Sequence, residues 1–180
     1  QEPLAEPQQS QKTRLAPDDD ASYNSPGISP DGKFVVYSSD RGGNKGKEQL
    51  WLQPVGGGDP VQVTHCSDPC VVPRFTPNGL SIVYQRRGNE DSFIESIPLL
   101  GGQSRQIAVM KGFRRYSPPA VAPDGNRVAF YDLASLPWRL LTVPVEGGEL
   151  REVAAHDRLK NEGETSVRPL WPSDSRHLIV

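Results

Sequence analysis

Three side chains capable of metal binding or redox chemistry lie within one short stretch of the sequence. His65 and Cys66 are adjacent, and Cys70 follows after an interval of three residues. A structural zinc site needs four ligands, typically two matched pairs, and the two remaining histidines stand alone in other parts of the chain. We therefore predict no metal or cofactor here. A disulfide between Cys66 and Cys70 is expected in an oxidising compartment and two free thiols in the cytosol, and the sequence leaves both alternatives open.

Carboxylate and amide side chains recur at regular intervals, at Asp31, Asn78, Asp124 and Asp174. Paired carboxylates can carry out acid–base catalysis. Each of these residues, however, stands in a short turn in which Asp or Asn accepts hydrogen bonds from its own backbone, and the four are tens of residues apart. We interpret them as turn residues. The acidic run 18–20 lacks the spaced ligands and the glycine of a calcium loop, so a solvated loop is expected there.

Two short basic clusters lie in segments that we predict to be loops. They consist of Arg86 and Arg87, and of Arg114 and Arg115 beside Lys111. Guanidinium groups bind phosphate or carboxylate, so these four arginines are the candidate binding residues, with a solvated surface as the alternative. The sequence contains no G-x-S-x-G motif and no glycine-rich loop before a helix. We therefore name no catalytic residue and expect no enzymatic activity.

The composition bounds the fold and the partners of the chain. Its 180 residues suit one domain, and 17 glycines with 18 prolines are too many turn formers for a helical bundle. The formal net charge of −2 creates no strong field for nucleic acid or anionic lipid, so neither is expected as a partner. No apolar run approaches the length of a membrane span and residues 1–11 lack the features of a signal peptide, so we expect a soluble chain without membrane insertion.

A repeat runs through the sequence. Pro-Asp-Gly, Pro-Asn-Gly, Pro-Asp-Gly and Ser-Asp-Ser place the second turn residue at positions 31, 78, 124 and 174, which are 47, 46 and 50 residues apart. Five residues before each stands a further proline, namely Pro26, Pro73, Pro119 and Pro169. Gly-Gly pairs at 57–58, 101–102 and 147–148 mark a second turn, because glycine permits the positive φ of a tight hairpin. A fixed period of this length is typical of repeat folds.

Each unit is expected to form four short strands. Apolar runs rich in β-branched and aromatic residues follow the turns, for example 34–37 and 128–131, and they are too short for helices. Four-stranded units at this period stack radially as propeller blades. We therefore predict an all-β fold, a partial β-propeller of four-stranded antiparallel blades with about three and a half blades present. The expected units are 26–64, 73–108, 119–154 and a partial unit at 169–180, with an outer strand at 12–16 and a disordered linker at 1–11.

The segments SPGISPDGKFVVYSSDRGGN and QLWLQPVGGGDPVQVT resemble the repeat of TolB-like, WD-repeat-like β-propellers, and the resemblance covers residues 12–180. Asn78 and Ser175 depart from the repeat at the turn, and the aromatic residue usual before it is found only as Phe75 and Trp171. Closed propellers of this family have more blades, so the resemblance implies part of a larger propeller. It also implies a periplasmic or extracytoplasmic location, as in the propellers of bacterial Ser/Thr kinases and winged-helix regulators, while a cytoplasmic location stays open.

These features favour a non-catalytic propeller module that binds a protein, a peptide or another ligand. The resemblance implies the sensor or interaction part of a larger bacterial protein, such as a receptor-type Ser/Thr kinase. The alternative is an accessory propeller of an enzyme, either a prolyl-oligopeptidase-like peptidase or a polysaccharide lyase. Binding residues collect in variable loops on a rigid scaffold, here the loops between second and third strands and between blades. Open blade edges are apolar, so self-association through them is a further expectation.

Overall fold

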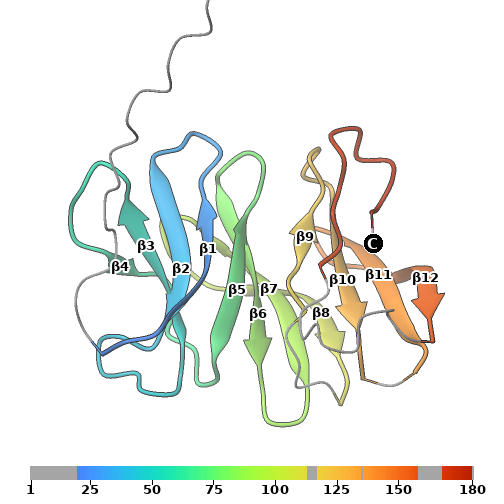
Figure 1. Ribbon diagram of the computed structural model, residues 1–180, viewed down its shortest axis with the longest axis horizontal. Coiled ribbons are helices and arrows are strands. Elements are labelled where there is room, and N and C mark those ends of the chain that lie inside the picture. The colour runs from blue at the N-terminus through green and yellow to red at the C-terminus, as the bar shows by residue number, and fades with distance from the viewer. Residues whose placement is uncertain (1–19, 113–116, 135, 158–167, 180) are drawn as a thin grey trace, which may run out of the picture.

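The computed structural model of the chain describes residues 20–112, 117–134, 136–157 and 168–179. Among these residues, twelve strands form three four-stranded sheets, and each sheet pairs consecutive strands in chain order. All of the strand pairs are antiparallel. The three sheets stand side by side as blades (Figure 1). The prediction of an all-β partial propeller is therefore confirmed.

The blades have the following strands. Blade 1 consists of β1 (Tyr23–Ile28), β2 (Phe34–Ser39), β3 (Gln49–Pro54) and β4 (Val61–Gln62). Blade 2 consists of β5 (Cys70–Phe75), β6 (Ser81–Arg87), β7 (Ser92–Pro98) and β8 (Arg105–Met110). Blade 3 consists of β9 (Ala120–Val121), β10 (Arg127–Asp132), β11 (Trp138–Pro144) and β12 (Arg151–His156). A further antiparallel bridge joins Leu170 to Ile179 in the fourth unit.

Some of the expected segments lie outside the described residues. These are the linker at 1–11 and the outer strand at 12–16. The limits of the repeat units therefore stay a prediction. The described residues include no helix long and apolar enough to span a membrane.

The turn carboxylates and the turn amide have a structural role. Asp31 Oδ1 accepts hydrogen bonds from the Ser29 hydroxyl at 2.7 Å and from the Lys33 backbone N–H at 3.1 Å. Asn78 Oδ1 makes the same pair of contacts in blade 2, with Thr76 and Leu80. The Ser29 hydrogen bond, followed by that of the Lys33 backbone, lowers the pKa of Asp31. These bonds hold the chain reversal before β2 and β6, as the sequence predicted.

Adjacent turns also pack against one another. Gly79 has a φ of +70°, and a Cβ built on it would lie 3.6 Å from the Pro30 ring of blade 1. Gly125 has a φ of +76° and stands in the same way next to Pro77 of blade 2. Ser175 occupies the equivalent position of the fourth unit with a φ of 55°, a conformation that costs a residue with a Cβ more than it costs glycine. The turn glycines therefore serve both the local reversal and the contact between blades.

We expect Gly79→Ala to lower the free energy of unfolding by about 1 kcal/mol, because an L-residue resists the left-handed region. The space beside Gly79 is ordinary van der Waals contact, so the cost arises from φ rather than from a clash. Gly56→Ala is the matched control, since Gly56 has no positive φ and open space around its Cβ. Urea unfolding of both variants measures the difference, and equal stability of the two would contradict this explanation.

The first strands of the blades begin differently from what the sequence indicated. β1 and β5 start before the repeat prolines and contain a bulge, at which Ser25 has a φ of 53° and Val72 a φ of 49°. In the third unit, the position equivalent to Ser25 and Val72 is held by Pro118. A proline ring restricts φ to about −65°, so the same bulge cannot form. This restriction explains why β9 has only two residues, Ala120 and Val121.

The core lies between the blades. One buried cluster joins Val36 and Leu50 of blade 1 to Ile82 and Tyr84 of blade 2. A second cluster joins blade 2 to blade 3 and includes Val83 from the same strand, β6. Since successive side chains of a strand point to opposite faces, β6 contributes to both clusters. Blade 2 is therefore buried on both faces and forms a rigid support for its loops.

Candidate functional site

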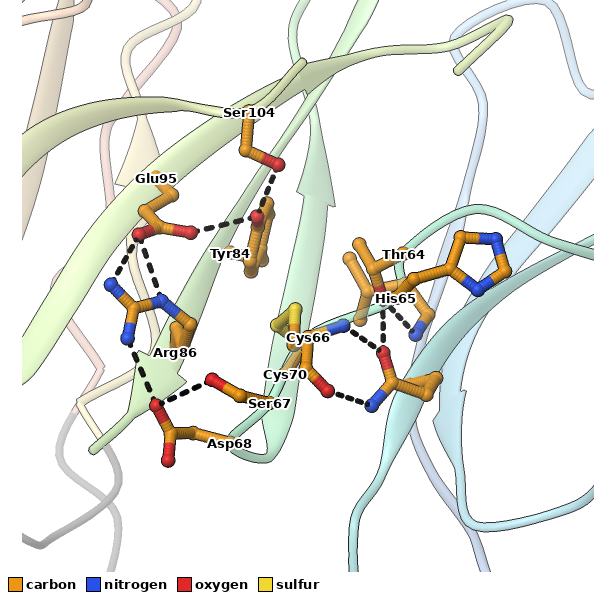
Figure 2. The surroundings of a disulfide bond; sticks show 12 residues. Thr64, His65, Cys66, Ser67, Asp68, Cys70, Tyr84, Arg86, Glu95 and Ser104 are labelled. Carbon is orange, nitrogen blue, oxygen red and sulfur yellow. Dashed lines mark hydrogen bonds and ion pairs between the residues drawn. A yellow bond between two sulfur atoms is a disulfide. The ribbon is translucent and has the colours of Figure 1, made fainter. Parts of the chain in front are cut away.

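The loop that connects blade 1 to blade 2 is closed by a disulfide. Cys66 lies in the loop after β4, Cys70 is the first residue of β5, and their sulfur atoms are bonded. Cys70 is completely buried, whereas Cys66 is partly exposed. His65 and Ser67, on either side of Cys66, are both exposed. The loop thus has an anchored base and an accessible tip (Figure 2).

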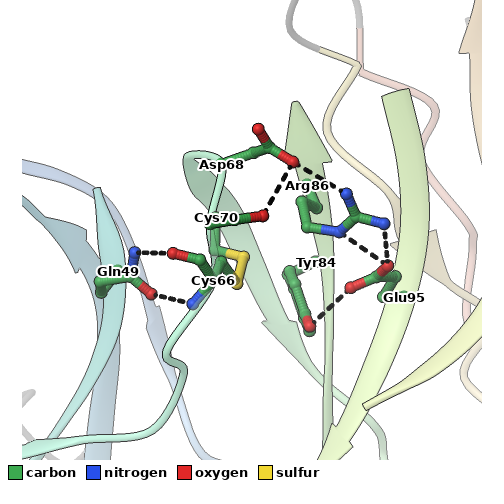
Figure 3. Close-up of polar contacts among 8 residues, drawn as sticks. Gln49, Cys66, Asp68, Cys70, Tyr84, Arg86 and Glu95 are labelled. Carbon is green, nitrogen blue, oxygen red and sulfur yellow. Dashed lines mark hydrogen bonds and ion pairs between the residues drawn. A yellow bond between two sulfur atoms is a disulfide. The ribbon is translucent and has the colours of Figure 1, made fainter. Parts of the chain in front are cut away.

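Blade 1 holds this loop through one buried amide side chain. Gln49 Oε1 accepts hydrogen bonds from the Cys66 backbone N–H at 2.8 Å and from the Thr64 hydroxyl at 3.0 Å. Its Nε2 donates to the Cys66 carbonyl oxygen at 3.1 Å. Figure 3 shows both bonds between Gln49 and Cys66. Because Gln49 is buried and these bonds satisfy both ends of its amide, the loop has a defined position against β3.

Blade 2 holds the other side of the loop through ion pairs. Arg86 on β6 donates to Asp68 Oδ2 of the loop at 3.0 Å and to Glu95 Oε1 of β7 at 2.9 Å. Its guanidinium also stacks 4.0 Å from the centroid of the Phe93 ring. Burial alone would lower the pKa of Arg86, but the bonds to Glu95 and Asp68 outweigh it and raise this pKa. Arg86 therefore stays charged and links the loop to the blade.

The network continues into the blade through a buried tyrosine. The Tyr84 hydroxyl is hydrogen-bonded to Glu95 Oε2 and to Ser104 Oγ, each at 2.8 Å. Tyr84 is completely buried, and Glu95 lies opposite it in the β6–β7 register. Burial raises the pKa of Tyr84 well above its ordinary value of 10.0, and the nearby charge of Glu95 adds to the rise. Tyr84 therefore keeps its proton at neutral pH and acts as a hydrogen-bonding group, not as a base.

A cavity of about 330 Å³ lies beside this network. Its walls come from the loop and from blade 2, and include Thr64, His65, Cys66, Tyr84, Arg86 and Glu95. Arg86 and Glu95 neutralise one another across 2.9 Å. The cavity can therefore form hydrogen bonds with a ligand, and the loop that supplies them is held in place by both blades. Such an arrangement can bind a ligand by hydrogen bonds.

The structure describes two of the four candidate arginines, Arg86 and Arg87. Arg86 and Arg87 belong to strand β6 and not to the loop that the sequence indicated. Both are largely buried, and Arg87 lies 3.8 Å from Glu48 of the preceding blade. Arg86 and Arg87 thus connect parts of the fold, which corrects their expected place in a loop. Arg114 and Arg115 lie outside the described residues.

Sequence reasoning missed the partners of Arg86. In the structure the two cysteines lie near Arg86. The contacts of this group also include four residues that the sequence did not indicate, namely Gln49, Asp68, Tyr84 and Glu95. One signal was available, because Tyr84 and Arg86 are two residues apart and share one face if the strand after the Asn78 turn continues to Arg86. The carboxylate of Glu95, next to Ile94 in the middle of a strand, was a second signal. Neither signal identifies which residue is the partner.

Tyr84 makes the stability of the protein sensitive to alkali. A tyrosine whose pKa is raised on folding contributes stability that is present below its unfolded pKa, about 10, and lost as the pH rises through the folded value. We therefore expect the free energy of unfolding to fall as the pH rises above about 10, and to fall less steeply in Tyr84→Phe. Tyr131 also has a pKa raised by burial, so part of the slope remains in the variant. Urea unfolding at several alkaline pH values tests this, and identical slopes for both proteins would contradict it.

Comparison with known proteins identifies the fold. No protein-family model matches the chain, and no curated protein matches it in sequence. Among solved structures, it is similar to a TolB-type protein from Agrobacterium tumefaciens, with a TM-score of 0.65, 19% identity and 91% of this chain covered. It is also similar to oligogalacturonate lyase from Vibrio parahaemolyticus, with a TM-score of 0.62, 18% identity and 80% coverage of this chain. A third similar structure is the β-propeller domain of the Trilobed protease from Pyrococcus furiosus, with a TM-score of 0.56, 18% identity and 74% coverage of this chain.

The chain spans only part of each of these proteins. It covers 57% of the TolB-type protein, 43% of the lyase and 43% of the protease propeller domain. At these identities the similarity concerns the fold alone. The predicted resemblance to TolB-like β-propellers is confirmed at that level.

Proposed function

We propose that this chain is a non-catalytic binding module, which binds a protein or peptide on the side of its blades that carries the β2–β3 and β6–β7 loops, called the loop side below. The observation that supports this proposal is the contrast between the two sides of the propeller. The β1–β2, β5–β6 and β9–β10 turns lie along the upper edge in Figure 1, and the β2–β3 and β6–β7 loops lie along the lower edge. The turns repeat one geometry with glycine at positive φ, whereas the loops differ in length, as 40–48, 88–91 and 133–137 show. Binding residues are typically carried by such variable loops on a rigid scaffold.

The disulfide loop is the part of this side best prepared for binding. Gln49 and Arg86 fix it from two blades, and the exposed side chains of His65 and Ser67 stand at its tip. A loop that is already ordered loses little conformational entropy when it binds. We place the module outside the cytoplasm, because disulfides persist in oxidising compartments and the TolB-like resemblance implies the same. There it would serve as the sensor or interaction part of a larger bacterial protein, such as a receptor-type Ser/Thr kinase.

A second candidate function is that of an accessory propeller within an enzyme. The observation that favours it is the similarity to oligogalacturonate lyase and to the propeller domain of a protease. In that case the propeller would guide a substrate toward a catalytic centre. The two candidates differ in what the loop side contacts, which is a separate partner in the first and a substrate in the second.

A peptide selection with surface variants tests the proposal. Peptides selected from a random phage library against the intact chain are expected to bind Lys47→Glu and His65→Glu at least tenfold more weakly than the parent. Leu80→Glu and Asn126→Lys are the matched controls, because these exposed residues lie at the turns between first and second strands. Isothermal titration measures each affinity. If only the turn-side variants lose binding, the proposed face is wrong, and if the chain cleaves the selected peptides, the non-catalytic role is wrong.

A further inference from the structure

A second cavity, away from the disulfide loop, lies against the first strands of the blades. These strands contact one another, β1 with β5 and β5 with β9, and thus lie innermost in the arc. The cavity has a volume of about 290 Å³, and its principal lining residues are Arg74, Phe75, Pro119, Arg168, Leu170 and Trp171. Among the residues that the structure describes, its lining contains two arginines and no acidic residue. It is therefore a positively charged cavity in a chain whose net charge is slightly negative.

The repeat shows that the fold does not require an arginine at position 74. Arg74 stands four residues before the turn residue Asn78, and the other units hold Gly27, Ala120 and Leu170 at the same offset. Blades with these small or apolar residues form the same turns and the same strand pairs. Arg74 is therefore an addition of blade 2 and not a part of the common scaffold.

The same comparison applies to the second arginine. Arg168 directly precedes the repeat proline Pro169, and the other units hold Ser25, Val72 and Pro118 there. None of these three side chains carries a charge. Two different units thus place an arginine at two different repeat positions, and both arginines line one cavity.

The electrostatics of the two arginines are unfavourable. The Arg74 guanidinium donates from its Nη1 to the Pro73 carbonyl oxygen at 2.6 Å. Within the described residues neither Arg74 nor Arg168 forms an ion pair with a carboxylate. Burial lowers the pKa of Arg74, and the nearby charge of Arg168 lowers it further. Two guanidinium groups that line one cavity, with no acidic partner in the part of the chain that the structure describes, are stabilised by a bound anion.

The remaining walls of the cavity are apolar and held in place. Phe75 and Trp171 come directly before the turns of their units, and the Trp171 indole N–H donates to the Ala120 carbonyl oxygen at 3.0 Å. Pro119 and Leu170 also belong to the apolar part of the lining. An anion bound here would therefore contact rings and aliphatic groups beside the two cations. Such a lining favours an acid with an apolar body over inorganic phosphate.

We infer that this cavity is a binding site for a carboxylate carried on an apolar or aromatic group, with Arg74 and Arg168 as the residues that hold the carboxylate. Two sources have this chemistry, namely the C-terminal residue of a peptide and a free aromatic acid. Because the site lies on inner strands and not on the loop side, it is independent of the function proposed above.

The test uses the full chain and small acids of known structure. N-acetyl-phenylalanine is titrated into the protein by isothermal titration and by NMR, beside its uncharged amide as the matched ligand. We expect saturable binding of the acid, at least tenfold weaker binding of the amide, and at least tenfold loss of affinity in Arg74→Gln and in Arg168→Gln. Arg151→Gln, at an exposed position of β12, is the control variant and should bind as the parent does. Equal binding of acid and amide, or unchanged affinity in both cavity variants, overturns the inference.

Two further measurements distinguish a peptide C-terminus from a free acid as the ligand, and show whether the Arg168→Gln variant folds. Stronger binding of N-acetyl-phenylalanyl-phenylalanine than of phenylacetate identifies a peptide C-terminus, and the reverse order identifies a free acid. In the absence of ligand, Arg168→Gln is expected to melt at the same temperature as the parent or higher, because it removes a like-charge contact. A lower melting temperature would show that Arg168 has a structural partner, and would overturn its role as a binding residue.

Discussion

Replacing Arg86 with methionine is expected to lower the free energy of unfolding by about 3 kcal/mol, because it leaves a buried carboxylate without its cation. The side chain of Glu95 is only 9% exposed, and Arg86 lies 2.9 Å from its Oε1 atom. The same change removes the bond to Asp68, which ties the disulfide loop to blade 2. Methionine preserves most of the packing of Arg86 against Phe93, so the loss reports on charge. Urea unfolding at neutral pH measures it.

A double variant distinguishes the unpaired charge from lost packing. Arg86→Met combined with Glu95→Leu should recover most of the stability, since replacing both members of a buried ion pair by apolar residues is often close to neutral. The Tyr84 hydroxyl keeps its bond to Ser104 in that variant. If the double variant is as unstable as the single one, the explanation by an unpaired charge is wrong.

Removing the disulfide is expected to lower the free energy of unfolding by about 2 kcal/mol, the chain-entropy value for so short a loop. Cys66 and Cys70 are four residues apart in the sequence, and the Cys70 side chain is buried. For a protein of this size the loss corresponds to a decrease of about 4–8 °C in the melting temperature. The double variant Cys66→Ala and Cys70→Ala, followed by circular dichroism during heating, measures it.

Reductant supplies the internal control for this second prediction. Dithiothreitol should lower the melting temperature of the parent protein and leave that of the double alanine variant unchanged. Thr64→Val in the parent background tests the other anchor of the loop, because the Thr64 hydroxyl bonds both Gln49 and the Leu50 backbone N–H. A parent protein that melts at the same temperature with and without reductant would show that the disulfide does not stabilise the fold.

Local features explain why so much of the fold could be predicted from sequence. The geometry of a turn such as that at Asp31 depends on residues within a few positions of one another, and the apolar runs that follow identify strands by their length and composition. Repetition then makes the architecture evident, because a unit that recurs must stack on copies of itself. The start of the first strand of each blade was predicted less accurately. The bulges at Ser25 and Val72 depend on positive φ in residues whose types do not suggest it.

The candidate site could be predicted only in part. The proximity of Cys66 and Cys70 in the chain made a disulfide one of two alternatives, whereas the sequence indicated for Arg86 a loop position with either a binding role or a solvated surface. Its actual partners come from the interblade loop and from β7, and Gln49 reaches the same loop from β3. Adjacent basic residues do not reveal on their own whether they are paired.

The sequence by itself determined the all-β class, the repeat, the positions of the turns and the separation of uniform turns from variable loops, since all of these follow from short-range preferences and their period. Only the tertiary structure decided which side chains meet. The β5–β6 register sets Arg86 opposite Cys70 and so beside Asp68, and the convergence of inner strands brings Arg74 and Arg168 to one cavity. Such pairs depend on strand register and on the placement of separate units, and no local pattern in the chain encodes these quantities.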